Sequence, residues 1–234
     1  IRAEGLRYRI APTNKVVTVH MGIDLNRFSP ERVNGATTRC QWGINSDEPV
    51  VGTVARLVPD KGLDCFLDAA ARVAGRHPRT RFLIVGGGPL QPALEQRARD
   101  LGIANRVIFT GVRSDIPEHL AAMDLFVLPT LREGFGVVFA EAMAMGKVVV
   151  GSDIGPVREV VTDGETGLLF PPDNTDGFAE AIVSLLADEP RRRVMSAAGR
   201  RRVEQCFDER KMFERTETEY RRLLNKKAWD FARG

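Results

Sequence analysis

The chain has 234 residues, of which 43% are hydrophobic and 28% are charged, and its net charge is only +3. This composition is that of an ordinary globular protein with a sizeable core, which excludes a disordered chain. So small a net charge gives no support for nucleic-acid binding, and no apolar run approaches the roughly 20 residues of a membrane-spanning helix.

Short apolar runs alternate with amphipathic stretches along the chain. The runs fall at 16–19, 50–55, 81–86, 107–110, 125–128, 148–151 and 167–170 and predict strands. Helical patterns fall at 62–76, 90–101, 116–122, 137–145, 157–162 and 177–187, and two more follow at 191–206 and 209–225. Strands that alternate with helices pair in parallel, and strands this apolar are covered on both faces. We therefore predict an α/β fold: a doubly wound, parallel-sheet, Rossmann-like domain with additional C-terminal helices.

Glycine-rich or charged loops follow five of the predicted strands. They contain Arg56 and Lys61, then residues 86–89, 111–113, 133–136 and 152–155. Ligands of open α/β sheets bind outside the carboxyl ends of the strands. We therefore expect these loops to share one cleft.

Residues 133–141 read Glu-Gly-Phe-Gly-Val-Val-Phe-Ala-Glu and place two carboxylates around the start of a predicted helix. Gly134, Phe135, Gly136 and Val137 supply main-chain amides at that start, where the helix dipole favours an anion. Glu141 lies within an otherwise apolar helix, so a charge there needs a partner. The simpler alternative is an ordinary loop acid at Glu133 and an exposed helix residue at Glu141.

Six segments in order, together with these motifs, resemble the C-terminal, donor-binding domain of retaining nucleotide-sugar glycosyltransferases of the GT-B fold. That family is glycosyltransferase family 4, the glycosyl transferases group 1. The segments are 20–28, 52–62, 85–89, 129–141, 151–155 and 164–170, and the likeness extends over about residues 16–207. The glutamate pair alone is a weak signal, whereas the ordered set is specific.

The resemblance implies a role for each candidate residue. Arg56 and Lys61 hold the diphosphate of the donor and neutralise it as it departs, a task suited to a forked guanidinium and a point charge. Glu133 contacts the transferred sugar, and Glu141 accepts hydrogen bonds from the ribose. The remaining positions that it implies are Val112 and Arg113, in the base-binding loop, and the amides of Gly134, Phe135, Gly136 and Val137 on the phosphates. A solvated basic pair is the simpler alternative for Arg56 and Lys61.

The resemblance implies a UDP- or GDP-linked hexose as the donor, with neither a metal nor another cofactor. In the sequence, no His, Cys, Asp or Glu cluster has metal-site spacing. The glycines at 86–88 do not complete a dinucleotide fingerprint, because Gln91 stands at its last position. Cys40, Cys65 and Cys206 are interpreted as small buried residues of a reducing compartment, and His77 and His119 as surface residues.

We expect three parts: residues 1–15 as the end of a missing N-terminal GT-B domain or a hinge, 16–207 as the nucleotide-sugar domain, and 208–234 as a helix that packs toward the missing domain. The start at Ile1 suggests a fragment that binds the donor and transfers sugar poorly or not at all by itself. The acceptor is a glycan, a lipid or a small molecule.

A cytoplasmic enzyme without nucleic-acid partners is expected. The arginines at 191–193 and 200–202 predict a solvated helix face, with a peripheral contact at the cytoplasmic membrane face as the alternative. Two other functions stay open. One is a non-catalytic donor-binding subunit of a split glycosyltransferase, and the other is a different GT-B enzyme such as a nucleotide-sugar epimerase.

Overall fold

The computed structural model describes residue 8, residue 12 and residues 15–231, without the side chains of 226–231. Its centre is one parallel sheet of six strands in the order β3-β2-β1-β4-β5-β6. Most strand residues are buried, as expected when both faces are covered. The α/β prediction is confirmed. The strands are β1 (Val50–Val54), β2 (Arg81–Val85), β3 (Val107–Phe109), β4 (Leu125–Leu128), β5 (Val148–Ser152) and β6 (Gly167–Phe170).

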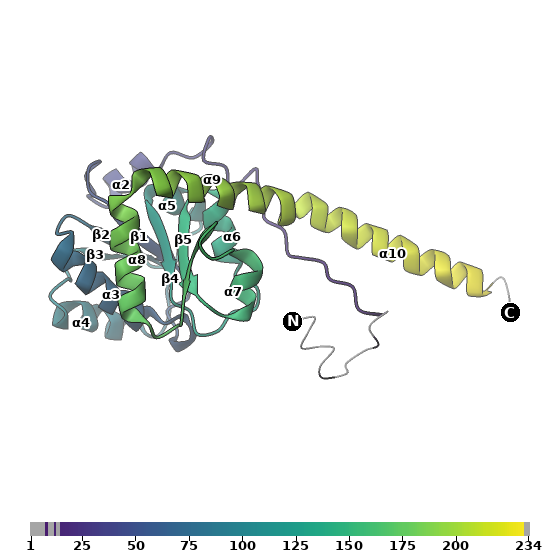
Figure 1. The fold of residues 1–234 in the computed structure, drawn as a ribbon, viewed down its shortest axis with the longest axis horizontal. Helices are drawn as coiled ribbons and strands as arrows, with labels where there is room; N and C mark the ends of the chain where they lie inside the picture. Colours follow the sequence, from purple (N-terminus) through teal and green to yellow (C-terminus); the bar gives the residue numbers. More distant parts are fainter. Residues whose placement is uncertain (1–7, 9–11, 13–14, 232–234) are drawn as a thin grey trace.

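Helices cover both faces of the sheet (Figure 1). On one face α3 (Leu63–Arg76) packs against α4 (Gln91–Asp100) and α8 (Thr175–Ala187). The other face carries α5 (Ile116–Ala122), α6 (Val137–Ala144) and α7 (Gly155–Val160), with α2 (Gly35–Gln41) packed on α5. Next, α9 (Glu189–Cys206) crosses from α8 to α6, and α10 (Glu209–Phe231) extends away from the domain.

Phe139 fixes α6 on the sheet. Its ring is fully buried and lies edge-on to Phe126 of β4, with the ring centroids 5.5 Å apart. A Cβ on Gly151 of β5 would come within 2.6 Å of the same ring, so glycine at this position lets the helix lie close to the strand. Truncating such a ring costs about 3–5 kcal/mol. The core therefore determines where Glu141, two residues further along α6, is presented.

The predicted bounds of β4, β6 and α5 match the structure, and most others differ by one or two residues. The predicted strand at 16–19 is wrong: these residues join no ladder, and Val17 is 50% exposed. The predicted helix at 157–162 begins two residues earlier, with Pro156 in its first turn, where no amide is needed. Neither α2 nor the short 3-10 turn η2 (Pro59–Lys61) was predicted.

Residues 22–28, which we call the strap, run beside the junction of α9 and α10. The amide of Ile23 donates to the carbonyl of Phe207 at 2.6 Å, and the amide of Glu209 donates back to the carbonyl of Ile23 at 3.2 Å. A Cβ on Gly22 would lie 2.2 Å from the Cα of Glu209. The strap and the start of α10 are thus held in direct contact.

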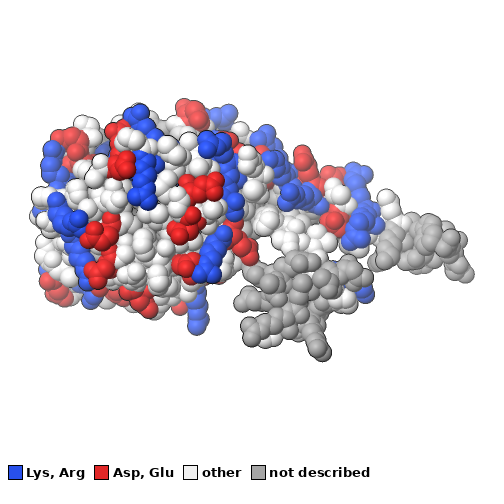
Figure 2. Space-filling model, in the orientation of Figure 1, with Lys and Arg blue, Asp and Glu red and all other residues white. Residues whose placement is uncertain are grey.

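The arginines of α9 do more than form the predicted solvated face. Half of the six donate to carbonyls at the carboxyl ends of other helices, where no intrahelical amide is left and the dipole favours a cation. On the face drawn in Figure 2, basic and acidic side chains are interleaved. The capping contacts are Arg192 with Leu185 and Leu186 of α8, Arg200 with Ala144 of α6, and Arg202 with Val160 and Glu159 of α7.

Two predictions about single residues are also wrong. His119 is fully buried, where Trp42 Nε1 donates to its Nε2 at 3.2 Å and its Nδ1 lies 2.9 Å from the carbonyl of Asp115. A neutral ring with the proton on Nδ1 satisfies both contacts. Cys40 and Cys206 are exposed rather than buried, and all three cysteines are free thiols. Among the described helices, none has both the length and the apolar composition to cross a membrane.

Candidate functional site

The loops that follow β1 and β4 meet where the strand order reverses. These two strands are neighbours, yet β2 and β3 lie on one side of the pair and β5 and β6 on the other. At such a point the connections leave toward opposite faces, which opens a crevice at the carboxyl edge of the sheet. The residues predicted to bind a ligand lie in these two loops, in the loop after β3 and on α6.

The carbonyl of Asp60 joins the two central loops. The amides of residues 131–132 donate to it at 2.8 and 3.3 Å, and the hydroxyl of the fully buried Thr130 lies 3.0 Å from it. Gly62 completes the contact: its φ is +61°, and a Cβ there would lie 1.9 Å from the carbonyl oxygen of Pro129. Because main-chain groups make these contacts, the two loops behave as one unit.

Lys61 and Glu133 form an ion pair within this unit. The Lys61 ammonium donates to Glu133 Oε1 at 2.5 Å, and the two side chains are only 20% and 12% exposed. Charge-assisted hydrogen bonds of this kind are about twice as strong as neutral ones. The structure therefore brings the residue predicted to bind a diphosphate against the residue predicted to bind a sugar. An incoming anion competes with Glu133 for the ammonium group.

The two predicted arginines, Arg56 and Arg113, differ in whether the guanidinium already has a partner. Arg56 is exposed, and its guanidinium has no hydrogen-bond or ion-pair partner in the described chain. Arg113 instead makes a bidentate pair with Asp115, at 2.9 and 2.7 Å, which raises the pKa of Arg113 and lowers that of Asp115. Val112 beside it is 83% exposed. At 112–113 the main chain, more than the side-chain charge, is therefore available to a ligand.

The amino end of α6 opens into the same crevice. Gly136 is its N-cap with φ +84°, and no side chain caps the helix. The amide of Phe139 donates to the carbonyl of Gly136 at 3.0 Å, which leaves the amides of Val137 and Val138 without a capping partner among the described residues. A Cβ on Gly134 would meet no protein atom within 4 Å, so the fold itself does not demand glycine there. Phe135 points elsewhere: its ring packs edge-on against Phe207, 5.5 Å between centroids, and fixes the loop.

Glu141 is half-buried on α6, and within the described residues its carboxylate has no hydrogen-bond or ion-pair partner. Burial raises its pKa, and the positive charge of Arg27 on the strap opposes that effect. Arg27 also donates to the carbonyl of Ser114 at 3.0 Å. No role for Arg27 was predicted from the sequence. Its place within the segment 20–28 is the one signal that could have drawn attention to it.

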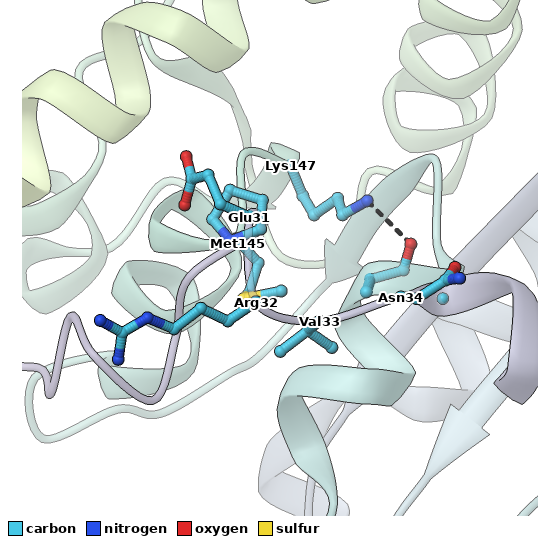
Figure 3. Close-up of a pocket in the computed structure, with 9 residues that line it drawn as sticks. Glu31, Arg32, Val33, Asn34, Met145 and Lys147 are labelled. Atoms are coloured by element: carbon cyan, nitrogen blue, oxygen red, sulfur yellow. Dashed lines mark hydrogen bonds between the residues drawn. The ribbon is translucent and has the colours of Figure 1, made fainter.

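A cavity of about 450 Å³ lies at the opposite, amino edge of the sheet, lined by residues 30–35, Ala121, Met145 and Lys147 (Figure 3). Lys147 donates to the carbonyl of Ala121 at 3.0 Å, and Arg39 to that of Ala122 at 2.9 Å. Both cations thus cap the carboxyl end of α5. Burial lowers the pKa of Lys147 to about 8. Because Lys147, the buried cation of this cavity, already caps α5, we place the candidate site at the carboxyl edge of the sheet.

No three His, Cys, Asp or Glu side chains in the described part of the chain are grouped so that they could hold a metal ion. The site consists of cations, main-chain amides and two carboxylates. Cations and amides suit phosphate oxygens, whereas half-buried carboxylates suit hydroxyl donors. The arrangement thus fits an elongated ligand with a phosphate-rich middle and hydroxyls at both ends.

Comparisons with known proteins point to one family. The profile of the glycosyl transferases group 1 matches residues 36–202. The GDP-mannose-dependent alpha-(1-6)-phosphatidylinositol monomannoside mannosyltransferase of Mycolicibacterium smegmatis is 39% identical over 188 residues, which are 76% of this chain and 49% of that protein. The chain spans about half the length of the curated relatives it matches.

Two solved structures show the same fold. Anabaena HepE in complex with UDP and glucose superposes with a TM-score of 0.85 at 28% identity, covering 94% of this chain and 60% of that one. The C-terminal domain of the group 1 protein LpcC from Francisella tularensis superposes with a TM-score of 0.72 at 26% identity. This match covers 80% of this chain and 99% of that domain.

Proposed function

The chain belongs to the glycosyl transferases group 1, and from this membership we propose that it is the donor-binding domain of a retaining, metal-independent hexosyltransferase. The observation that carries the proposal is the Lys61–Glu133 pair at the switch point of the sheet. It supplies a cation for a diphosphate and an acceptor for sugar hydroxyls beside the uncapped end of α6. The UDP and glucose bound by HepE are the parts of such a ligand.

In this proposal the protein stabilises the leaving group. Arg56, Lys61 and the first amides of α6 bind the diphosphate and neutralise the charge that develops as it departs, which is usually the largest contribution to such catalysis. The bond between the anomeric carbon and the phosphate oxygen breaks, and a bond to the acceptor oxygen forms on the same face of the sugar. The proton of the acceptor hydroxyl passes to the departing phosphate, so no protein nucleophile is needed.

The two glutamates bind opposite ends of the donor. Glu133 accepts hydrogen bonds from the hexose, and Glu141 accepts them from the ribose. Their environments suit this division, because Glu133 lies against Lys61 whereas Glu141 has no hydrogen-bonding partner among the described residues. GDP-mannose is the first donor to test, since the mycobacterial relative is named as dependent on it; UDP-glucose is the second, since HepE also forms a complex with it.

Acceptor contacts come from a second domain in this proposal. In support, α10 leads away from the sheet domain and exposes Phe213, Tyr220 and Leu224, which the helical repeat puts on one side. We place this helix against that second domain and the enzyme in the cytoplasm, which suits three free thiols. The chain by itself then binds the donor and transfers sugar slowly or not at all.

Calorimetry and thermal shift with UDP, GDP, UDP-glucose and GDP-mannose test the proposal. One nucleoside diphosphate and its sugar conjugate should bind and raise Tm by mass action, equally with EDTA and with Mg²⁺. Binding of neither nucleotide family, or binding only with a divalent cation, contradicts it. Efficient transfer of the hexose by this chain alone contradicts the proposal that a second domain supplies the acceptor contacts.

A further inference from the structure

Arg27 contacts one part of the site and acts through its charge on another, from outside the motifs that define the site. Its Nη2 donates to the carbonyl of Ser114, at 3.0 Å, in the loop after β3. Its charge also acts on the carboxylate of Glu141 on α6. The guanidinium lies 5.3 Å from the ring centroid of the buried Phe28, which limits where it can move. One side chain thus links the strap, the β3 loop and α6.

We propose that Arg27 is the positioning residue of the nucleoside end of the donor site, holding the loop at 111–115 through its bond to Ser114 so that a base on this loop and a ribose at Glu141 are accepted together. This inference rests on the proposed function, because it assumes that a nucleoside diphosphate is the ligand. A base bound along the main chain of 111–115 keeps its ribose within reach of Glu141 only while the loop keeps its position relative to α6.

The electrostatics support this role. An ionised carboxylate only accepts hydrogen bonds and so suits two ribose hydroxyl donors, whereas a protonated one carries a donor of its own, and burial disfavours the ionised form of Glu141. The other cations on the elements around α6 are engaged elsewhere: Arg113 with Asp115, Arg158 with Asp153, Arg200 with Glu204 and the carbonyl of Ala144, and Arg202 with the carbonyls of α7. Within the described chain, Arg27 is therefore the charge that favours the ionised carboxylate.

The strap does not need this guanidinium to keep its fold. The Asp24 carboxylate accepts from the amides of Asn26 and Arg27 at 2.9 and 3.1 Å, and the carbonyl of Asp24 accepts from the amide of Phe28 at 2.9 Å. Arg200 donates to the carbonyl of Phe28 at 3.0 Å. Because these contacts are independent of the Arg27 side chain, substitutions of Arg27 should fold.

Calorimetry of UDP and GDP from pH 5.5 to 8.5 tests the inference on the whole chain and its Arg27→Met, Arg27→Lys and Glu141→Gln variants. Arg32→Met is the matched control, because Arg32 is exposed on the following segment and lines the cavity at the other edge. We expect Arg27→Met to weaken the preferred nucleotide by about tenfold at pH 7.5, the effect of one charged hydrogen bond. The loss should grow as the pH falls.

A purely structural role of Arg27 would not change how nucleotide affinity depends on pH. This pH dependence therefore distinguishes the two roles. Arg27→Lys should restore it, since the charge is kept, and in a Glu141→Gln background Arg27→Met should leave the pH profile unchanged. The affinity for inorganic pyrophosphate should stay unchanged throughout. NMR titration of the Glu141 carboxyl carbon should show a higher pKa in Arg27→Met than in the wild type.

The outcomes separate the two proposals. If UDP or GDP binds the wild type and Arg27→Met behaves like Arg32→Met in affinity and pH profile, the Arg27 inference is wrong and the proposed function stands. If neither nucleotide binds, the proposed function fails and this inference falls with it.

Discussion

The ammonium group of Lys61 and the carboxylate of Glu133 lie 2.5 Å apart although 72 residues of sequence separate them. The contact depends on the Asp60 carbonyl, which fastens the loop after β4 to the loop after β1. The cation that binds the diphosphate in the proposed function is thus already engaged by a carboxylate. Under that proposal, donor binding has to loosen or share this bond, which would link the phosphate and sugar ends of the site.

Lys61→Met should weaken binding of the preferred nucleoside diphosphate by about 1.5–3 kcal/mol, because it removes a charged hydrogen bond. Glu133→Gln should leave that affinity unchanged or improve it, since Lys61 is then free for the phosphates. The gain in affinity from the attached sugar should shrink in Glu133→Gln. Calorimetry with the nucleotide and its sugar conjugate measures both effects, and equal losses of plain nucleotide affinity in the two variants would contradict the division of roles.

Arg56 and Arg113 form a second matched pair of cations. Arg56→Gln should weaken nucleoside diphosphate binding by about 1.5–3 kcal/mol, because its guanidinium is unpaired in the described chain. Arg113→Gln should have a much smaller effect, since Asp115 already neutralises that charge. Calorimetry at low and high salt measures both, and the salt dependence should fall only in the Arg56 variant. The assignment of Arg56 to the diphosphate is wrong if the order of the two effects is reversed.

Glu141→Gln should raise the free energy of unfolding at pH 7 and weaken nucleotide binding. A carboxyl whose native pKa is raised holds its proton at pH values where the unfolded chain has lost it. Its contribution to stability is therefore greatest below the unfolded pKa and is lost as the pH rises through the native value. Urea unfolding at pH 4.5 and pH 7 should show the advantage of the variant only at the higher pH. If Glu141→Gln is less stable than the wild type at pH 7, burial of the ionised carboxylate does not lower the stability of the protein.

Lys147→Met should change how stability depends on alkaline pH. The native pKa of about 8 lies below the ordinary 10.5, so between these values the unfolded chain binds more protons and the wild type gains stability as the pH rises. The free energy of unfolding of the wild type, relative to the variant, should rise by up to about 3 kcal/mol from pH 7 to pH 10. Lys15→Met, at an exposed lysine, is the control and should show no such change.

Much of the sheet could be predicted because its strands are apolar on both faces and separated by amphipathic helices. The failure at 16–19 has a physical cause: a short apolar run becomes a strand only where a neighbouring strand offers a free edge, and these residues join no ladder. The helix α2 was missed because its sequence, Gly-Ala-Thr-Thr-Arg-Cys-Gln, has no apolar stripe. Its contact with α5 supplies what the local pattern lacks.

The site shows the same limits. Charged side chains and glycines at strand ends are visible in a sequence, and the structure brings Lys61 and Glu133 together. The Asp60 carbonyl could not be foreseen, because every residue has a carbonyl and only the fold directs this one to the neighbouring loop. The proposed role of Arg27 depends on a contact with Ser114, 87 positions away, which no local pattern reports.

The hydrogen bonds of Ile23 with Phe207 and Glu209 have an evolutionary consequence. Because both connections of the sheet domain leave side by side, a single break across them releases the whole unit without opening its core. Recombination at this place can join the unit to a different neighbour through both of its connections.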